Sequence, residues 1–246
     1  MKIFINTWVY ENEVKKGIKQ EDLFERIKAN GADGIEVRRE YFKDISTEIE
    51  AINQKREQTG LLVNYSVPDE VFEKDGSINP SLEKYFNEAM IMGITKIKFN
   101  LGNFRKYRGN LKQDLKQFPL DKIKMNIEND QTEISGKIKN IKYFLQNAQQ
   151  NGVKIGYVYD LGNWAFTHQS ADSAAHQLSP YVDYIHLKNT FSNDDNLETS
   201  NDLNSGMFLW KDLLKKLPKV DIALEYPMDS DQKVRLQLEL LKNEVR

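Results

Sequence analysis

The chain has 246 residues, of which 39% are hydrophobic and 11% aromatic, a globular composition with enough apolar residues for a sizeable core. The formal net charge of -2 gives no basic footprint for nucleic acid or anionic lipid, and the absence of cysteine excludes disulfides and thiolate metal ligands. No apolar stretch reaches membrane length and the N-terminus is too mixed for a secretory signal, so we expect a cytoplasmic protein that acts on a small molecule.

Apolar, β-branched runs alternate with stretches of helical period along the whole chain. Eight runs predict strands, at residues 2–7, 34–37, 61–65, 96–100, 122–127, 153–159, 182–187 and 221–225. Between them, apolar periodicity with glycine or proline punctuation predicts helices at 21–30, 45–60, 80–93, 111–118, 135–152, 170–178, 208–217 and 231–243.

Repeated strand–helix units with short connections indicate parallel pairing, because each parallel link needs a crossover. Eight units of about 30 residues each predict an α/β fold, a single (β/α)8 TIM barrel that spans residues 1–246 as one domain. The structural competitor is an open doubly wound sheet, but no GxGxxG motif follows the first strand. The longest irregular polar stretch, residues 189–206, follows the seventh strand, where a loop of this length is typical of a lid.

Ionisable side chains stand at the ends of four successive predicted strands. Glu128, Asp160, His186 and Glu225 end the fifth to eighth strands, and in a barrel these ends converge on one mouth. Each one alone is typical of a turn, a helix cap or a packed histidine. Three carboxylates brought together would repel one another unless a cation neutralised them. We therefore expect a site for one divalent metal ion, Mn²⁺, Mg²⁺ or Co²⁺, with Zn²⁺ also compatible.

With these motifs the chain resembles the xylose isomerase-like TIM barrel superfamily, whose members include sugar phosphate isomerases and epimerases, ketose 3-epimerases, inosose dehydratases and endonuclease IV. The resemblance runs from GADGIEV, which contains Glu36, to IALEYP, which contains Glu225. In the epimerase branch a Glu, Asp, His, Glu quartet binds one divalent ion. By position, the resemblance implies that Glu128, Asp160, His186 and Glu225 are the metal ligands.

The sequence departs from the family pattern at two places. The family often has a histidine three residues after the aspartate of strand six, where this chain has Asn163, and often an arginine in the loop after strand seven, where residues 187–206 contain none. The nuclease branch needs further histidines, and the three in this chain cannot supply that cluster. These departures weigh against cleavage of DNA.

The resemblance implies a carbohydrate isomerase or epimerase that acts on a keto-sugar through an enediolate. In that branch two glutamates on opposite sides of the substrate remove and return the proton, roles that would fall to Glu128 and Glu225. Two alternatives stay open. The first is a metal-dependent dehydratase similar to inosose dehydratase, and the second is a non-catalytic barrel that binds a sugar.

Five further residues are candidates for substrate binding at the mouth: Trp8, Glu36, Asn100, Asn163 and Lys188. Trp8 would pack on a sugar face or serve as a rim aromatic, and Glu36 would bind a hydroxyl or hold a basic side chain. Lys188 would orient an anionic ligand or form a structural ion pair. The substrate would be a sugar or a sugar phosphate, and a homo-oligomer is compatible with the family.

Overall fold

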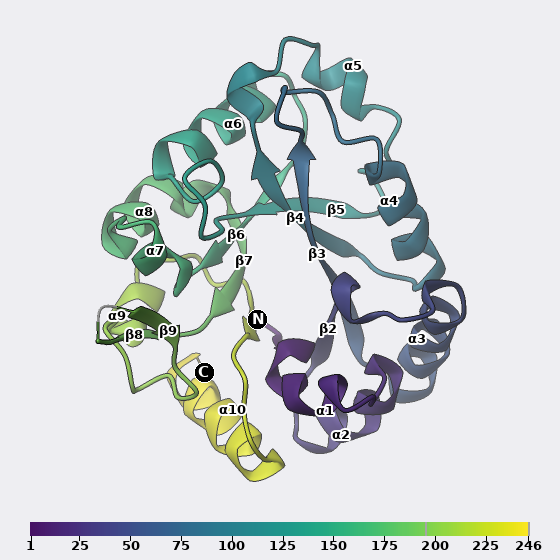
Figure 1. Ribbon diagram of the computed structural model, residues 1–246, viewed down its shortest axis with the longest axis vertical. Coiled ribbons are helices and arrows are strands. Elements are labelled where there is room, and N and C mark those ends of the chain that lie inside the picture. Colours follow the sequence, from purple (N-terminus) through teal and green to yellow (C-terminus); the bar gives the residue numbers. More distant parts are fainter. Residues whose placement is uncertain (195, 246) are drawn as a thin grey trace.

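The computed structural model describes residues 1–194 and 196–245, and these residues form one closed barrel of parallel strands (Figure 1). Around the barrel the strands follow the order β1, β10, β7, β6, β5, β4, β3, β2. Their bounds are β1 Ile3–Asn6, β2 Gly34–Arg38, β3 Leu62–Phe72, β4 Lys96–Gly102, β5 Lys124–Glu128, β6 Gly156–Asp160, β7 Val182–Leu187 and β10 Asp221–Leu224. All eight predicted strands are confirmed, and so is the (β/α)8 fold.

Helices connect the strands and form an outer ring. They are α1 Glu11–Lys15, α2 Phe24–Ala29, α3 Ile45–Thr59, α4 Leu82–Ile91, α5 Leu111–Leu115, α6 Ile138–Gln150, α7 Asn163–Phe166, α8 Ala171–Leu178, α9 Trp210–Leu214 and α10 Asp231–Val245. The longer helices bury one apolar stripe, and in α6 that stripe is Ile138, Ile141, Phe144, Leu145 and Ala148. None of the helices in the described residues is long and apolar enough to cross a membrane.

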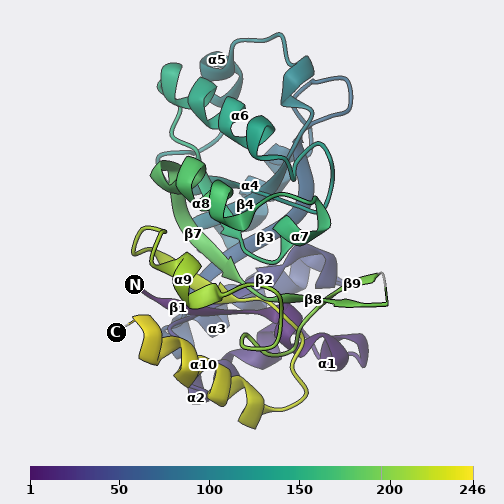
Figure 2. The same cartoon turned by 90° about the vertical axis from the view of Figure 1, so that its left-hand side faces the viewer.

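The segment after β7 contains structure that the sequence pattern did not reveal. Strands β8 (Thr190–Asn193) and β9 (Asn196–Thr199) pair as an antiparallel hairpin within the stretch expected to be an irregular lid. Its side chains are mostly polar and exposed, so no apolar alternation marks it. Figure 2 shows this hairpin on the side of the molecule opposite to both chain ends.

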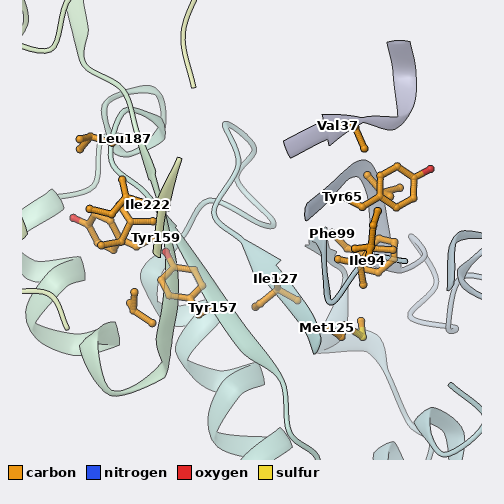
Figure 3. Packing of buried hydrophobic residues seen from close by; sticks show 14 of the residues in the cluster. Val37, Tyr65, Ile94, Phe99, Met125, Ile127, Tyr157, Tyr159, Leu187 and Ile222 are labelled. Atoms are coloured by element: carbon orange, nitrogen blue, oxygen red, sulfur yellow. The ribbon is translucent and has the colours of Figure 1, made fainter. Parts of the chain in front are cut away.

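The main core lies between the strands and the helices. Outward-facing strand residues such as Val37, Tyr65, Phe99, Ile127 and Tyr159 are fully buried there (Figure 3). Because side chains alternate along a strand, the intervening positions face the barrel interior. The inward positions near the carboxyl ends of the strands are polar or charged, and they build the candidate site.

Candidate active site and metal centre

The four predicted ligands converge at the mouth of the barrel. Glu128, Asp160, His186 and Glu225 each offer one donor atom, and all four donor atoms lie within 4.8 Å of one another. The strand register brings them level, because Asp160 pairs with His186 across β6 and β7. Each of the four residues is at most 4% exposed. The arc from β5 to β10 therefore presents a compact, buried cluster of three carboxylates and one imidazole.

Asp160 is held in place by Asn129, which follows β5. The Asn129 side chain accepts a hydrogen bond from the backbone N–H of Asp160 (2.9 Å) and donates one to its carbonyl (2.8 Å). One Asp160 carboxylate oxygen accepts from the backbone N–H of Asn163 (3.0 Å), which starts α7. A Cβ at Gly162 would lie 2.6 Å from the Lys188 Cγ, so a glycine in this turn lets the Lys188 side chain reach Asp160.

His186 is oriented by a carboxylate from across the barrel. Its Nε2 lies 2.8 Å from one Glu36 oxygen and 3.1 Å from the other, while its Nδ1 faces Glu128 and Glu225. Asn6, at the end of β1, donates hydrogen bonds to both Glu36 and Glu225. A carboxylate that binds one ring nitrogen directs the other nitrogen toward a metal position.

Three cations interleave with the carboxylates of the mouth. The Lys98 ammonium on β4 lies 2.5 Å from Glu128, and Arg38 at the end of β2 lies 2.8 Å from Glu225. Lys188 bridges Asp160 (2.6 Å) and Glu225 (3.0 Å). These pairs compensate part of the charge that burial would otherwise make costly.

The opposing charges shift the pKa values of the cluster in different directions. Burial works against the Glu128 carboxylate, but Lys98 and His186 outweigh it and lower its pKa to about 2. Glu225 follows the same pattern: burial opposes its charge, yet His186 and Lys188 hold its pKa well below the usual range. Burial dominates at Asp160 and raises its pKa to about 7, with the negative charges of Glu128 and Glu225 adding to the effect. The pKa of His186 is raised well above its usual value, because the three glutamates around it outweigh burial.

The donor set fits a divalent metal ion. Glu128 Oε1, Asp160 Oδ2 and His186 Nδ1 are buried without a hydrogen bond of acceptable geometry among the described residues, although charged atoms lie close to each. Carboxylate oxygens with one imidazole suit Mn²⁺, Mg²⁺, Co²⁺ or Zn²⁺. The four residues Glu128, Asp160, His186 and Glu225 can therefore hold a metal ion.

The remaining predicted residues fall into two groups. Trp8, Asn100, Asn163 and Lys188 line a cavity of about 330 Å³ at the mouth, next to the quartet. The Asn163 amide also connects two loops, since it donates to the Asn129 carbonyl and accepts from Gln131. Glu36 is not among the residues that line this cavity; it is 1% exposed, and its carboxylate contacts His186. The carboxylate also accepts a hydrogen bond from Asn6, and the role of Glu36 in binding a hydroxyl stays a prediction.

Sequence reasoning missed four polar residues of the site: Asn6, Arg38, Lys98 and Asn129. A usable signal existed for two of them. Arg38 and Lys98 each lie two residues from an inward-facing position, Glu36 and Asn100 respectively, so the alternation of the strand places them on the inner face as well. Asn6 and Asn129 carry no comparable signal, because an asparagine at a strand end is usually a turn residue.

The polar side chains of the quartet lie at the carboxyl ends of the strands of a closed parallel barrel, which is where TIM-barrel proteins have their sites. No protein-family model matches the chain, and no curated protein matches it. Solved structures do match. The probable 3-DHS dehydratase AsbF from Bacillus anthracis has a TM-score of 0.72 at 15% identity, over 99% of each chain. D-allulose 3-epimerase from Methylomonas sp. has a TM-score of 0.70 at 14% identity, over 99% of this chain and 98% of that one.

A xylose isomerase domain containing protein from Salmonella typhimurium LT2 is similar over 99% of this chain and 97% of its own length, with a TM-score of 0.72 and 11% identity. At these identities the likeness concerns the fold. The chain therefore has a xylose isomerase-like TIM-barrel fold, as the sequence resemblance implied.

Proposed function

We propose that this protein is a divalent-metal-dependent isomerase or epimerase that acts on a keto-sugar through an enediolate. The observation that carries the proposal is the assembly of Glu128, Asp160, His186 and Glu225 within 4.8 Å beside a mouth cavity of about 330 Å³. Similar folds in D-allulose 3-epimerase and L-ribulose 3-epimerase support the same reaction class.

The quartet would hold the ion, and a bound divalent ion acts as a Lewis acid that makes the C–H beside a carbonyl more acidic. Glu128 and Glu225 come from β5 and from the end of β10, at the two ends of the arc that carries the quartet. Both have pKa values below the usual range, so both are ionised at neutral pH, the state that a general base requires. One glutamate would remove the proton from one face of the substrate. The other would first take up a proton from solvent and then deliver it to the opposite face.

The residues around the two glutamates control their position. Lys98 fixes one oxygen of Glu128, while Arg38 and Asn6 fix one oxygen of Glu225. Trp8 closes one side of the cavity, and its ring lies 5.2 Å from the Lys188 ammonium. A ring at this place can pack on the apolar face of a sugar and exclude water from the reacting carbon.

A dehydratase is the second candidate, and Lys188 favours it. Its ammonium lies between Asp160 and Glu225 and can give a proton to a departing hydroxyl. In that reaction a base removes the proton beside the carbonyl, and the β-hydroxyl leaves as water, so that an enone forms. The similarity in fold to a probable 3-DHS dehydratase is consistent with this chemistry.

Metal analysis combined with Glu128→Gln and Glu225→Gln tests the proposal. We expect the purified wild-type protein to hold about one equivalent of metal and to exchange deuterium from the carbon next to the carbonyl of an accepted ketose. Each variant should lose at least about a hundredfold in exchange rate. The matched control is Glu83→Gln, an exposed glutamate on α4.

The measurement separates the alternatives. Formation of an enone absorbance without exchange into recovered ketose would favour the dehydratase. A protein without metal or turnover would favour the non-catalytic barrel. Full turnover by Glu128→Gln would remove that residue from the mechanism.

A further inference from the structure

Three cationic side chains line the mouth cavity, more than a neutral sugar would need. Arg38, Lys98 and Lys188 all line it, together with the carboxylates Glu128 and Glu225. Lys98 and Lys188 are 6% and 4% exposed, so both ammonium groups are taken out of bulk water. A buried cation is costly unless an anion or several acceptors satisfy it.

Two of these cations come from strands that carry no residue of the metal quartet. Arg38 comes from β2 and Lys98 from β4, the two neighbours of β3, whereas the quartet comes from β5, β6, β7 and the end of β10. Pro68 of β3 lines the cavity with them. Arg38 and Lys98 therefore stand at the β2–β4 part of the mouth, and each forms an ion pair with one glutamate of the quartet.

Both of these cations keep unused hydrogen-bond donors. Within the described residues, the Lys98 ammonium has one polar contact, the ion pair with Glu128. The Arg38 guanidinium uses Nε for Glu40 and Nη1 for Glu225 and Asn6, and Nη2 has no partner in the same part of the chain. N–H donors without a protein partner, on two cations beside the same cavity, are typical of a site that binds an anion.

A divalent ion would increase the need for an anion. Lys98 and Arg38 are neutralised by Glu128 and Glu225, which are also the residues that would hold the metal. When the metal shares those carboxylates, less negative charge is available for the lysine and the arginine. A neutral ligand leaves that imbalance in place, whereas an anionic ligand removes it.

We propose that the substrate carries a carboxylate, and that Arg38 and Lys98 bind this group while the keto-hydroxy end of the same molecule lies at the quartet. This inference rests on the proposed function and specifies its substrate class as a keto-hydroxy acid. A carboxylate fits better than a phosphate, because Glu128, Asp130 and Glu225 also line the small cavity and would repel a dianion more strongly.

Three ligands that differ only at one carbon test the inference: D-fructose, D-fructuronate, in which carbon 6 is a carboxylate, and D-fructose 6-phosphate. Binding to the full chain is measured by titration calorimetry, first with Mn²⁺ alone, then with each ligand in Mn²⁺ buffer and in chelator. We expect fructuronate to bind at least tenfold more tightly than fructose, and more tightly than the phosphate.

Two variants connect that preference to the cations. In Arg38→Gln and in Lys98→Gln the preference for fructuronate over fructose should fall about tenfold. The ratio of the two affinities cancels any change in metal loading, since both ligands meet the same site. Lys139→Met, which removes an exposed lysine from α6, should keep the wild-type ratio.

The outcomes are distinct. Equal binding of fructose and fructuronate, no binding of the acid, tighter binding of the phosphate, or an unchanged ratio in both variants would overturn the inference. Failure of Mn²⁺ to bind would instead count against the proposed function. A fructuronate preference that depends on Arg38 and persists in chelator would still support the carboxylate site.

Discussion

Asn129 is the residue whose removal tests how the candidate site is held together. It is fully buried, and its side chain makes three hydrogen bonds: it donates to the Asp160 carbonyl, and it accepts from the Asp160 N–H and from the Tyr157 hydroxyl (2.6 Å). It thereby connects the end of β5, where Glu128 lies, to the end of β6. We predict that Asn129→Ala destabilises the protein and misplaces Asp160.

The magnitude follows from the partners that the alanine leaves behind. A buried donor or acceptor without a partner costs about 1–3 kcal/mol. The substitution leaves three such groups, on Asp160 and Tyr157, without a hydrogen-bond partner. Partial relaxation brings the expected loss in free energy of unfolding to roughly 3–6 kcal/mol, a large share of the 5–15 kcal/mol typical of a domain.

Urea unfolding followed by circular dichroism measures this loss. The control is Asn151→Ala, an exposed asparagine whose one side-chain hydrogen bond goes to the Asn147 carbonyl, and we expect a change within about 0.5 kcal/mol. If Asn129→Ala lost no more stability than the control, Asn129 would not hold the strand end. Mn²⁺ affinity should also fall in Asn129→Ala, which a defect remote from the site would not produce.

Three further predictions concern the metal centre and the loop after β7. Glu36→Gln should weaken Mn²⁺ binding about 10- to 100-fold in calorimetry, because the carboxylate that orients His186 is lost; unchanged affinity would show that it does not orient the ring. Mn²⁺ affinity should rise at least about fivefold from pH 6 to pH 7, because burial raises the pKa of Asp160 to about 7 and the proton competes with the metal below that pH. The pKa of His186 is also raised, and this ring must lose a proton to bind the metal, so the rise should continue above pH 7; a flat profile would contradict both assignments. Asn189→Ala should speed proteolysis within residues 190–208 at least about fivefold, because the buried Asn189 side chain bonds the Leu203 and Phe208 carbonyls, whereas Asn193→Ala in the exposed hairpin should not; equal cleavage of the two variants would remove Asn189 as an anchor.

The barrel itself was predictable from the sequence because its signal is local and repeated. In β5 the buried apolar positions Met125 and Ile127 alternate with polar ones, β6 is a short apolar run, and helices such as α6 show a continuous apolar stripe. The polar strand ends were visible for the same reason, since Asp160 interrupts a buried run. The hairpin of β8 and β9 was missed because polar side chains dominate both of its faces.

Which residues come together in the site depends on closure of the barrel. Residues 36, 98, 128, 186 and 225 are far apart along the chain, and they meet because β1 pairs with β10 and β2 in one closed ring. A sequence pattern shows that Lys98 faces inward. It cannot show that the Lys98 ammonium forms an ion pair with Glu128, or that Glu36 contacts His186.

The sequence by itself therefore determined the repeating units and the residue types at the carboxyl ends of the strands, because hydrophobic periodicity is a property of neighbouring residues. Only the tertiary structure decided which charges compensate one another and which donors remain free for a ligand. Electrostatic interactions depend on distance in space and on burial, and both are set when the strands close into a barrel.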